Sequence, residues 1–133
     1  MKARDARKLL EQFAEFEVDR VIFGPFYVSI DFLGVHNVYL RVNKPFTVRQ
    51  ASQHYSFELE AASAQPAASL LVSCVGSKVA KLELAANMLT VQFSNSSVLS
   101  VQLGERDFEP IEISCCHHLA PNELLWLTTV EAE

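Results

Sequence analysis

Lys78–Leu103 reads KVAKLELAANMLTVQFSNSSVLSVQL and contains three short runs in which apolar and polar residues alternate. The apolar members of the three runs are Ala80, Leu82 and Leu84, then Leu89, Val91 and Phe93, and finally Leu99, Val101 and Leu103. Alternation with a period of two residues is typical of strands that bury one face. This stretch therefore predicts a three-stranded antiparallel meander with one apolar face.

The pairing within this meander is restricted, because a slip of one residue turns every side chain of a strand to the opposite face. Placing Leu84 opposite Leu89 and Phe93 opposite Leu99 keeps the apolar side chains on one side. Each intervening turn contains an asparagine, which tolerates the left-handed backbone conformation that such turns need. We expect the second of these turns at residues 95–97.

A second alternating region lies upstream, within residues 17–60. Its apolar members are Phe26, Val28, Ile30 and Phe32 in one run and Val38, Leu40 and Val42 in the next. A three-residue loop, 33–35, closes these runs, and we expect Gly34 to take a positive φ angle there. On the opposite face this register places Tyr27 across from Arg41, Ser29 across from Tyr39, and Asp31 across from Asn37.

Two helical segments complete the fold prediction. Residues 1–16 have the amphipathic spacing of a short N-terminal helix. Residues 61–76 predict a loop and a connecting helix that begins near Pro66 and ends at Gly76. We predict an α+β fold in a single domain, 1–133. It combines these helices with a mostly antiparallel, curved or barrel-like β-sheet of about 8–10 strands, arranged as two meanders, 17–60 and 77–130.

The composition excludes several classes of protein. The chain has 133 residues and a net charge of −5, which argues against nucleic acid as the partner because phosphate binding needs a basic surface. No apolar run approaches the roughly 20 residues that a membrane-spanning helix requires, so we expect no membrane partner. Three cysteines make a poor disulfide framework, and we expect a cytoplasmic location.

Cys115-Cys116-His117-His118 is the only run rich in side chains that ligate zinc. In an extended strand, neighbouring side chains point to opposite faces, so at most two of these four could share an ion. The four glycines are scattered and form no phosphate-binding loop. We therefore expect no metal site, no cofactor and no enzymatic activity.

The outward face of the first meander has the composition of a binding surface. It combines aromatic and charged residues, namely Tyr27, Asp31, Tyr39, Arg41, His54 and Glu58. Tyrosine and arginine are enriched at the energetic centres of protein interfaces. In the alternative arrangement, the helix at 66–75 covers this face and the tyrosines pack beneath it.

Acidic residues are concentrated in the final third of the chain. Those that we assign to the predicted binding surface are Glu105, Asp107, Glu109 and Glu112. An acidic region of this kind can steer a cationic protein toward the domain, and it can also simply keep the domain in solution.

Three further stretches set the order of elements along the chain. They are VDRVIFGPFYVSIDF at 18–32, PFTVRQ at 45–50 and FEPIEIS at 108–114. In this order of elements the chain resembles a family of small, functionally uncharacterised β-rich bacterial domains. In size and charge it also resembles the small acidic immunity proteins of toxin systems, including those of contact-dependent growth inhibition. The second resemblance implies a protein that binds a cationic toxin and occludes its active site.

Our functional expectation is therefore a stoichiometric protein-binding domain with an immunity-type role. Two alternatives stay open at this point. One is a small ligand- or metal-binding domain with a pocket near Cys115–His118. The other is a structural domain that forms a homodimer through an unprotected sheet edge.

Overall fold

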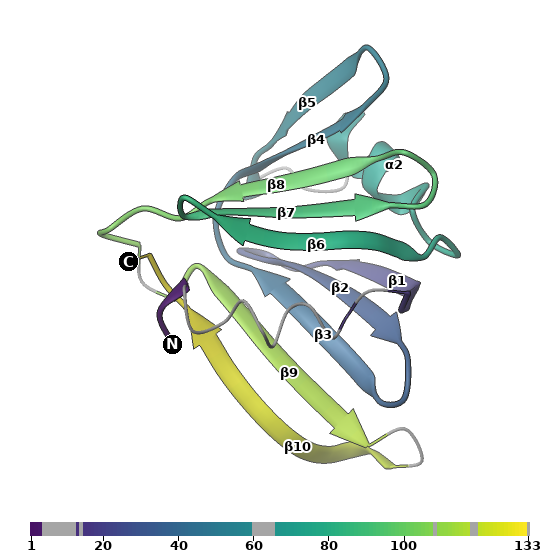
Figure 1. Ribbon diagram of the computed structural model, residues 1–133, viewed down its shortest axis with the longest axis vertical. Coiled ribbons are helices and arrows are strands. Elements are labelled where there is room, and N and C mark those ends of the chain that lie inside the picture. The colour runs from purple at the N-terminus through teal and green to yellow at the C-terminus, as the bar shows by residue number, and fades with distance from the viewer. Residues whose placement is uncertain (4–12, 14, 60–65, 108, 118–119, 133) are drawn as a thin grey trace.

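The computed structural model describes residues 1–3, 13, 15–59, 66–107, 109–117 and 120–132. Ten strands form two five-stranded antiparallel sheets, and the described residues contain one helix (Figure 1). The strands are β1 Glu17–Phe23, β2 Val28–Leu33, β3 Asn37–Val42, β4 Phe46–Gln50, β5 Gln53–Phe57, β6 Val79–Ala85, β7 Met88–Phe93, β8 Val98–Gln102, β9 Ile111–His117 and β10 Ala120–Val130, and the helix is α2 Pro66–Val72. The fold is thus mostly antiparallel β, as expected.

The two sheets do not coincide with the two predicted meanders. The first sheet has the order β1-β2-β3-β9-β10, and the second has the order β5-β4-β8-β7-β6. The chain leaves the first sheet at 43–45, where Pro45 cannot continue the hydrogen-bonded ladder of β3, and it enters the second sheet as β4. The last hairpin then returns to the first sheet, and β9 pairs with β3.

The meander formed by β6, β7 and β8 confirms the predicted faces except at Ala80, which is exposed where the pairing of β6 with β7 shifts between Val79 and Lys81. One of its two predicted registers is wrong. Leu84 lies opposite Leu89, as expected. Leu99, however, lies opposite Val91 rather than Phe93, a shift of two residues that leaves every side chain on its predicted face. The turn closes earlier than expected because the Phe93 amide donates to the Ser97 carbonyl.

The hairpin of β2 and β3 is shifted by two residues in the same way. Ser29 lies opposite Arg41, and Asp31 lies opposite Tyr39. Gly34 does not have the positive φ that we expected, since Gly76 is the one glycine in this conformation among the described residues. A Cβ atom on Gly34 would instead lie 2.3 Å from the Phe16 ring, so this position is restricted by close packing.

The two sheets meet at the start of β1. Main-chain hydrogen bonds connect the segment 15–18 with the segment 76–79, and Glu17 and Lys78 form an antiparallel bridge. Within the described residues, β5 and β10 each pair with a single strand, so the sheets do not close. The prediction of a barrel-like arrangement was therefore wrong, and the two sheets are open (Figure 1).

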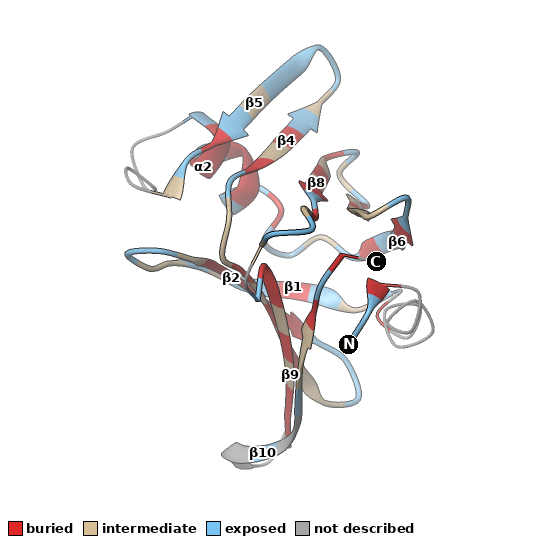
Figure 2. Cartoon of the chain, turned by 90° about the vertical axis from the view of Figure 1, so that its left-hand side faces the viewer, coloured by how far each residue is buried: buried red, intermediate tan, exposed pale blue. Residues whose placement is uncertain are grey.

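One buried cluster contains residues from both sheets and from α2 (Figure 2). Phe57 of β5 is fully buried and stacks on Phe46 of β4 and on Phe23 of β1, with ring centroids 4.7 and 5.8 Å away. This stack connects the second sheet with the first. Burial of large aromatic side chains is a major source of stability in a domain of this size.

The connecting helix begins at Pro66, as predicted, and its apolar side packs against β4 and β5. Leu71 and Cys74 are fully buried, and Gly76 takes a φ of 88° after the helix has ended. Most of the predicted N-terminal helix, 1–16, falls outside the described residues. No helix in the described part of the chain is long and apolar enough to cross a membrane.

Candidate functional site

The candidate site lies on the outer face of the first sheet, which is the face that points away from the buried cluster. Strand pairing arranges its side chains in rows that run across the sheet. One row contains Ile22, Ser29, Arg41, Glu112 and Thr129, and the next contains Arg20, Asp31, Tyr39, Ser114 and Leu127. The centre of this face is therefore polar, although the opposite face of the same strands is apolar.

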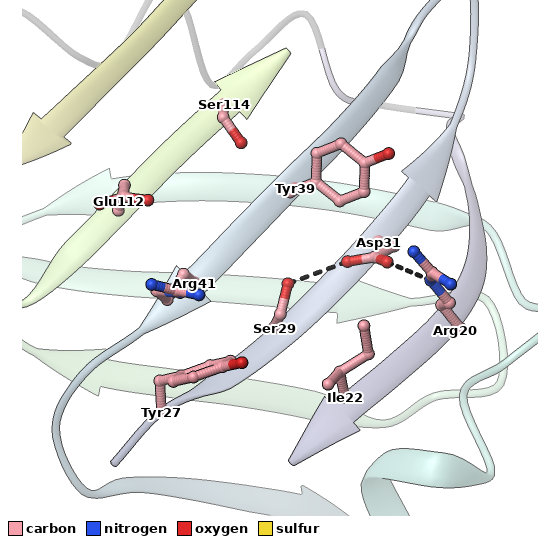
Figure 3. A pocket seen from close by; sticks show the side chains of 9 residues that line it. All are labelled: Arg20, Ile22, Tyr27, Ser29, Asp31, Tyr39, Arg41, Glu112 and Ser114. Atoms are coloured by element: carbon pink, nitrogen blue, oxygen red, sulfur yellow. Dashed lines mark hydrogen bonds and ion pairs between the residues drawn. The ribbon is translucent and has the colours of Figure 1, made fainter. Parts of the chain in front are cut away.

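Asp31 is the most buried charged group on this face, with 3% of its surface exposed. The Arg20 Nε donates to its Oδ2 over 2.5 Å, and the Ser29 hydroxyl donates to its Oδ1 over 2.9 Å (Figure 3). A buried carboxylate needs such partners, because an unpaired charge is costly to remove from water. The hydrogen bond and the charge of Asp31 raise the pKa of Arg20, so Arg20 stays protonated.

Arg41 stacks on an aromatic ring of the neighbouring loop. Its guanidinium carbon lies 3.8 Å from the centre of the Tyr27 ring, within the range of a cation–π contact. The Tyr27 ring packs against Gly24, where a Cβ atom would lie 2.2 Å from the ring. The absence of a side chain at Gly24 thus allows Tyr27 to lie flat beside Arg41.

Tyr39 lies opposite Asp31 on β3, the central strand of the sheet. Burial raises the pKa of its hydroxyl, and the neighbouring Cys116 and Asp31 act in the same direction. Tyr39 therefore stays neutral at physiological pH and can donate a hydrogen bond.

These side chains surround a hollow of about 200 Å³. Its lining, drawn in Figure 3, consists of Arg20, Ile22, Tyr27, Ser29, Asp31, Tyr39, Arg41, Glu112 and Ser114. The hollow is open and polar, and strands hold all of its lining except Tyr27, which lies in the loop before β2. Such a surface is suited to receiving a group from a partner, because its side chains lose little freedom on binding.

The structure brings together five of the predicted binding residues and separates the other five. Tyr27, Asp31, Tyr39, Arg41 and Glu112 line the hollow. His54 belongs to β5 in the second sheet, and Glu58 lines a different hollow with residues of that sheet. The alternative arrangement, in which the helix covers the tyrosines, was wrong because α2 packs on β4 and β5.

Sequence reasoning missed four residues of the hollow, namely Arg20, Ile22, Ser29 and Ser114. Ser114 reaches the site because β9 pairs with β3 across more than seventy residues of sequence, a contact that no local pattern indicates. Arg20 could have been found, since it lies opposite Asp31 once β1 is paired with β2. The sequence analysis did not assign a strand register to β1.

The remaining acidic residues lie in the loop between β8 and β9. Glu105 and Glu109 are exposed there. Asp107 instead stabilises the loop, because its Oδ2 accepts hydrogen bonds from the Lys44 ammonium and, over 2.6 Å, from the Gly104 amide. Burial opposes ionisation of Asp107, but these hydrogen bonds and the charge of Lys44 outweigh it and lower its pKa.

Replacing Asp107 with alanine is expected to lower the free energy of unfolding by about 1 kcal/mol at pH 7, because both hydrogen bonds are lost. Since the folded-state pKa of Asp107 is lowered, its contribution is present above the pKa of the unfolded chain and disappears as the pH falls through the folded value. Urea titrations at pH 7 and pH 3 measure this difference. Glu105→Ala, in the same loop but exposed, is the control. An equal effect of both substitutions would contradict the assignment.

Cys115 and Cys116 lie on opposite faces of β9, as expected for a strand. Cys115 belongs to the buried cluster, and Cys116 is beside Asn37 on the outer face. The side chains of His117 and His118 are outside the described part of the structure. Within that part, no three histidine, cysteine or carboxylate side chains are grouped so that they could hold a metal ion.

Comparisons with protein-family models, with curated proteins and with solved structures find no match to this chain. The resemblances noted from the sequence therefore stay predictions.

Proposed function

We propose that this chain is a stoichiometric protein-binding domain whose partner docks on the outer face of the first sheet. Its specific role in this proposal is that of a cytoplasmic immunity-type protein, which binds a bacterial toxin and occludes the active site of that toxin. The proposal involves no catalysis by this chain.

The observation that supports binding most strongly is the fixed arrangement of Arg41 on Tyr27 beside the pair of Arg20 and Asp31. Tyrosine and arginine contribute most to interface energies when neighbouring groups already hold them in their bound geometry. Apolar side chains surround this polar centre: Ile22, Leu33, Leu124 and Leu127 are 37–53% exposed. They provide area from which a partner can exclude water.

The charge of the domain supports a cationic partner. The net charge is −5, and Glu105 and Glu109 are exposed on the loop between β8 and β9. Opposite net charges accelerate encounter between two proteins and make the association rate sensitive to salt. We therefore expect the association rate to fall as ionic strength rises.

The test is calorimetric titration of this protein with the product of the neighbouring gene. We expect a 1:1 complex with a dissociation constant well below micromolar. Arg41→Ala should weaken it at least tenfold, because the stacked guanidinium is lost from the centre of the surface. The matched control is Arg49→Ala, on the exposed face of β4 in the second sheet, and it should leave the affinity unchanged. If no neighbouring product binds, or if both variants bind equally well, the proposal fails.

A homodimer is the second candidate, and one observation favours it. β10 is an edge strand of the first sheet, and Leu124 and Leu127 on it are about half exposed. An apolar edge of this kind can pair with a second copy. Light scattering distinguishes the two candidates, since a monomer has a mass of 14.9 kDa and a dimer has twice that mass.

A further inference from the structure

The hollow on the outer face has an unequal supply of hydrogen-bond donors and acceptors. Asp31 has no accessible acceptor, because Arg20 occupies one oxygen, Ser29 occupies the other, and only 4% of the side chain is exposed. The principal anion of the hollow is thus already neutralised. An incoming cation would have to displace Arg20 before it could reach this carboxylate.

The two guanidinium groups, in contrast, keep most of their donors. A guanidinium has five N–H donors in a planar fork. Among the residues that the structure describes, Arg20 donates only to Asp31, from its Nε, and 60% of its side chain is exposed. Arg41 stacks its plane on Tyr27 and donates no hydrogen bond to any residue that the structure describes. Stacking occupies the flat face of the guanidinium and leaves the edge, where its N–H groups point, open to an acceptor.

Glu112 is the second carboxylate of the hollow, and it accepts no side-chain hydrogen bond from the part of the chain that the structure describes. It is the direct cross-strand neighbour of Arg41 on β9, but the two side chains form no ion pair. Its charge favours a singly charged, planar anion over a doubly charged one, because repulsion grows with the charge of the incoming group. A carboxylate is planar, carries one charge and matches the fork of an arginine.

We infer that the hollow receives a carboxylate group of the partner protein, supplied by an Asp or Glu side chain. The fork of Arg41 holds this group on one side of Ser29, and the exposed guanidinium of Arg20 lines the hollow on the other side (Figure 3). This inference specifies the contact made in the proposed function. A partner that is cationic overall can still present one carboxylate at this point.

The experiment uses the free protein and small probes, so it does not depend on the identity of the partner. The side-chain Nε–Hε signals of the arginines are followed by NMR during addition of N-acetylglutamate α-amide, which has a single carboxylate. We expect the signals of Arg20 and Arg41 to shift and saturate in the millimolar range. The Arg49 signal, from an exposed arginine of the second sheet, should show no saturation. Equal behaviour of all three signals would overturn the inference.

Two further probes identify the chemistry of the ligand. Inorganic phosphate and N-acetylarginine amide should each bind more weakly than the carboxylate. Tighter binding of phosphate would replace the inference with a site for a tetrahedral anion. Tighter binding of the arginine probe would mean that the hollow takes a cation.

Two single substitutions give opposite predictions. Arg41→Lys keeps the positive charge but loses the fork, and it should weaken the carboxylate probe at least fivefold. Glu112→Gln removes the neighbouring negative charge, and it should strengthen the probe severalfold. A loss of binding in Glu112→Gln would contradict the inference. If the probes do not bind as expected, the carboxylate inference fails but the proposal of protein binding does not. If no protein partner is found, the probe results still test the carboxylate inference.

Discussion

Replacing Phe57 with alanine is expected to lower the free energy of unfolding by about 3–5 kcal/mol. Phe57 is fully buried and contacts aromatic rings of two other strands, Phe46 on β4 and Phe23 on β1. Truncation removes the buried ring and leaves a cavity at the contact between the two sheets. Because small domains are stable by only about 5–15 kcal/mol, this loss is a large fraction of the total.

Equilibrium denaturation in urea measures this effect, with Phe26→Ala as the matched control. Phe26 is 74% exposed and precedes β2, so the same truncation should change the stability by less than about 0.5 kcal/mol. A loss below about 1.5 kcal/mol in Phe57→Ala would mean that the sheets are held together mainly by other contacts.

Gly34→Ala is expected to cost about 2 kcal/mol, because its Cβ would overlap the Phe16 ring. Three ring carbons of Phe16 lie 2.3–2.5 Å from the position of this Cβ. Phe16 in turn packs against the buried cluster and lies 5.8 Å from the Phe13 ring, so the ring has little room to move. Either the turn between β2 and β3 or the aromatic pair must be displaced.

A double-mutant cycle separates this steric effect from backbone strain. In a Phe16→Ala background, Gly34→Ala should cost much less than in the natural chain, since the overlapping ring is gone. Gly76→Ala is the comparison, because Gly76 has no atom within 4 Å of its Cβ position but a φ of 88°. Its cost of about 1 kcal/mol should be independent of Phe16. Additive effects of Phe16→Ala and Gly34→Ala would contradict the steric explanation.

The sequence predicted the faces of the strands more reliably than their pairing. Side-chain alternation determines which residues are buried, and a shift of two residues preserves this, as for Leu99 opposite Val91. The exact register depends on where a turn closes, and side-chain parity alone does not determine this. The partition of strands into sheets was beyond local reasoning, since β3 pairs with β9 and not with β4.

For the candidate site, too, the sequence predicted which residues share a face better than it predicted which strands are neighbours. Tyr27, Asp31, Tyr39 and Arg41 share one face because they alternate with buried residues on two adjacent strands. His54 and Glu58 were assigned to this face on the assumption that neighbouring segments stay in one sheet, whereas the chain changes sheets at Pro45. Glu112 was included for its charge, and the structure places it beside Arg41 through the pairing of β3 with β9.

The junction between β1 and the segment before β6 has a consequence for how this fold can vary among organisms. It consists of main-chain hydrogen bonds, including those from the Val18 amide to Ser77 and from the Gly76 amide to Val18. Nearly any amino acid can supply such bonds, except proline at a donating position and a non-glycine residue at Gly76, where φ is 88°. We therefore expect homologues with different residues at this junction to retain the same arrangement of the two sheets. Structural comparison should then detect common ancestry where sequence comparison does not.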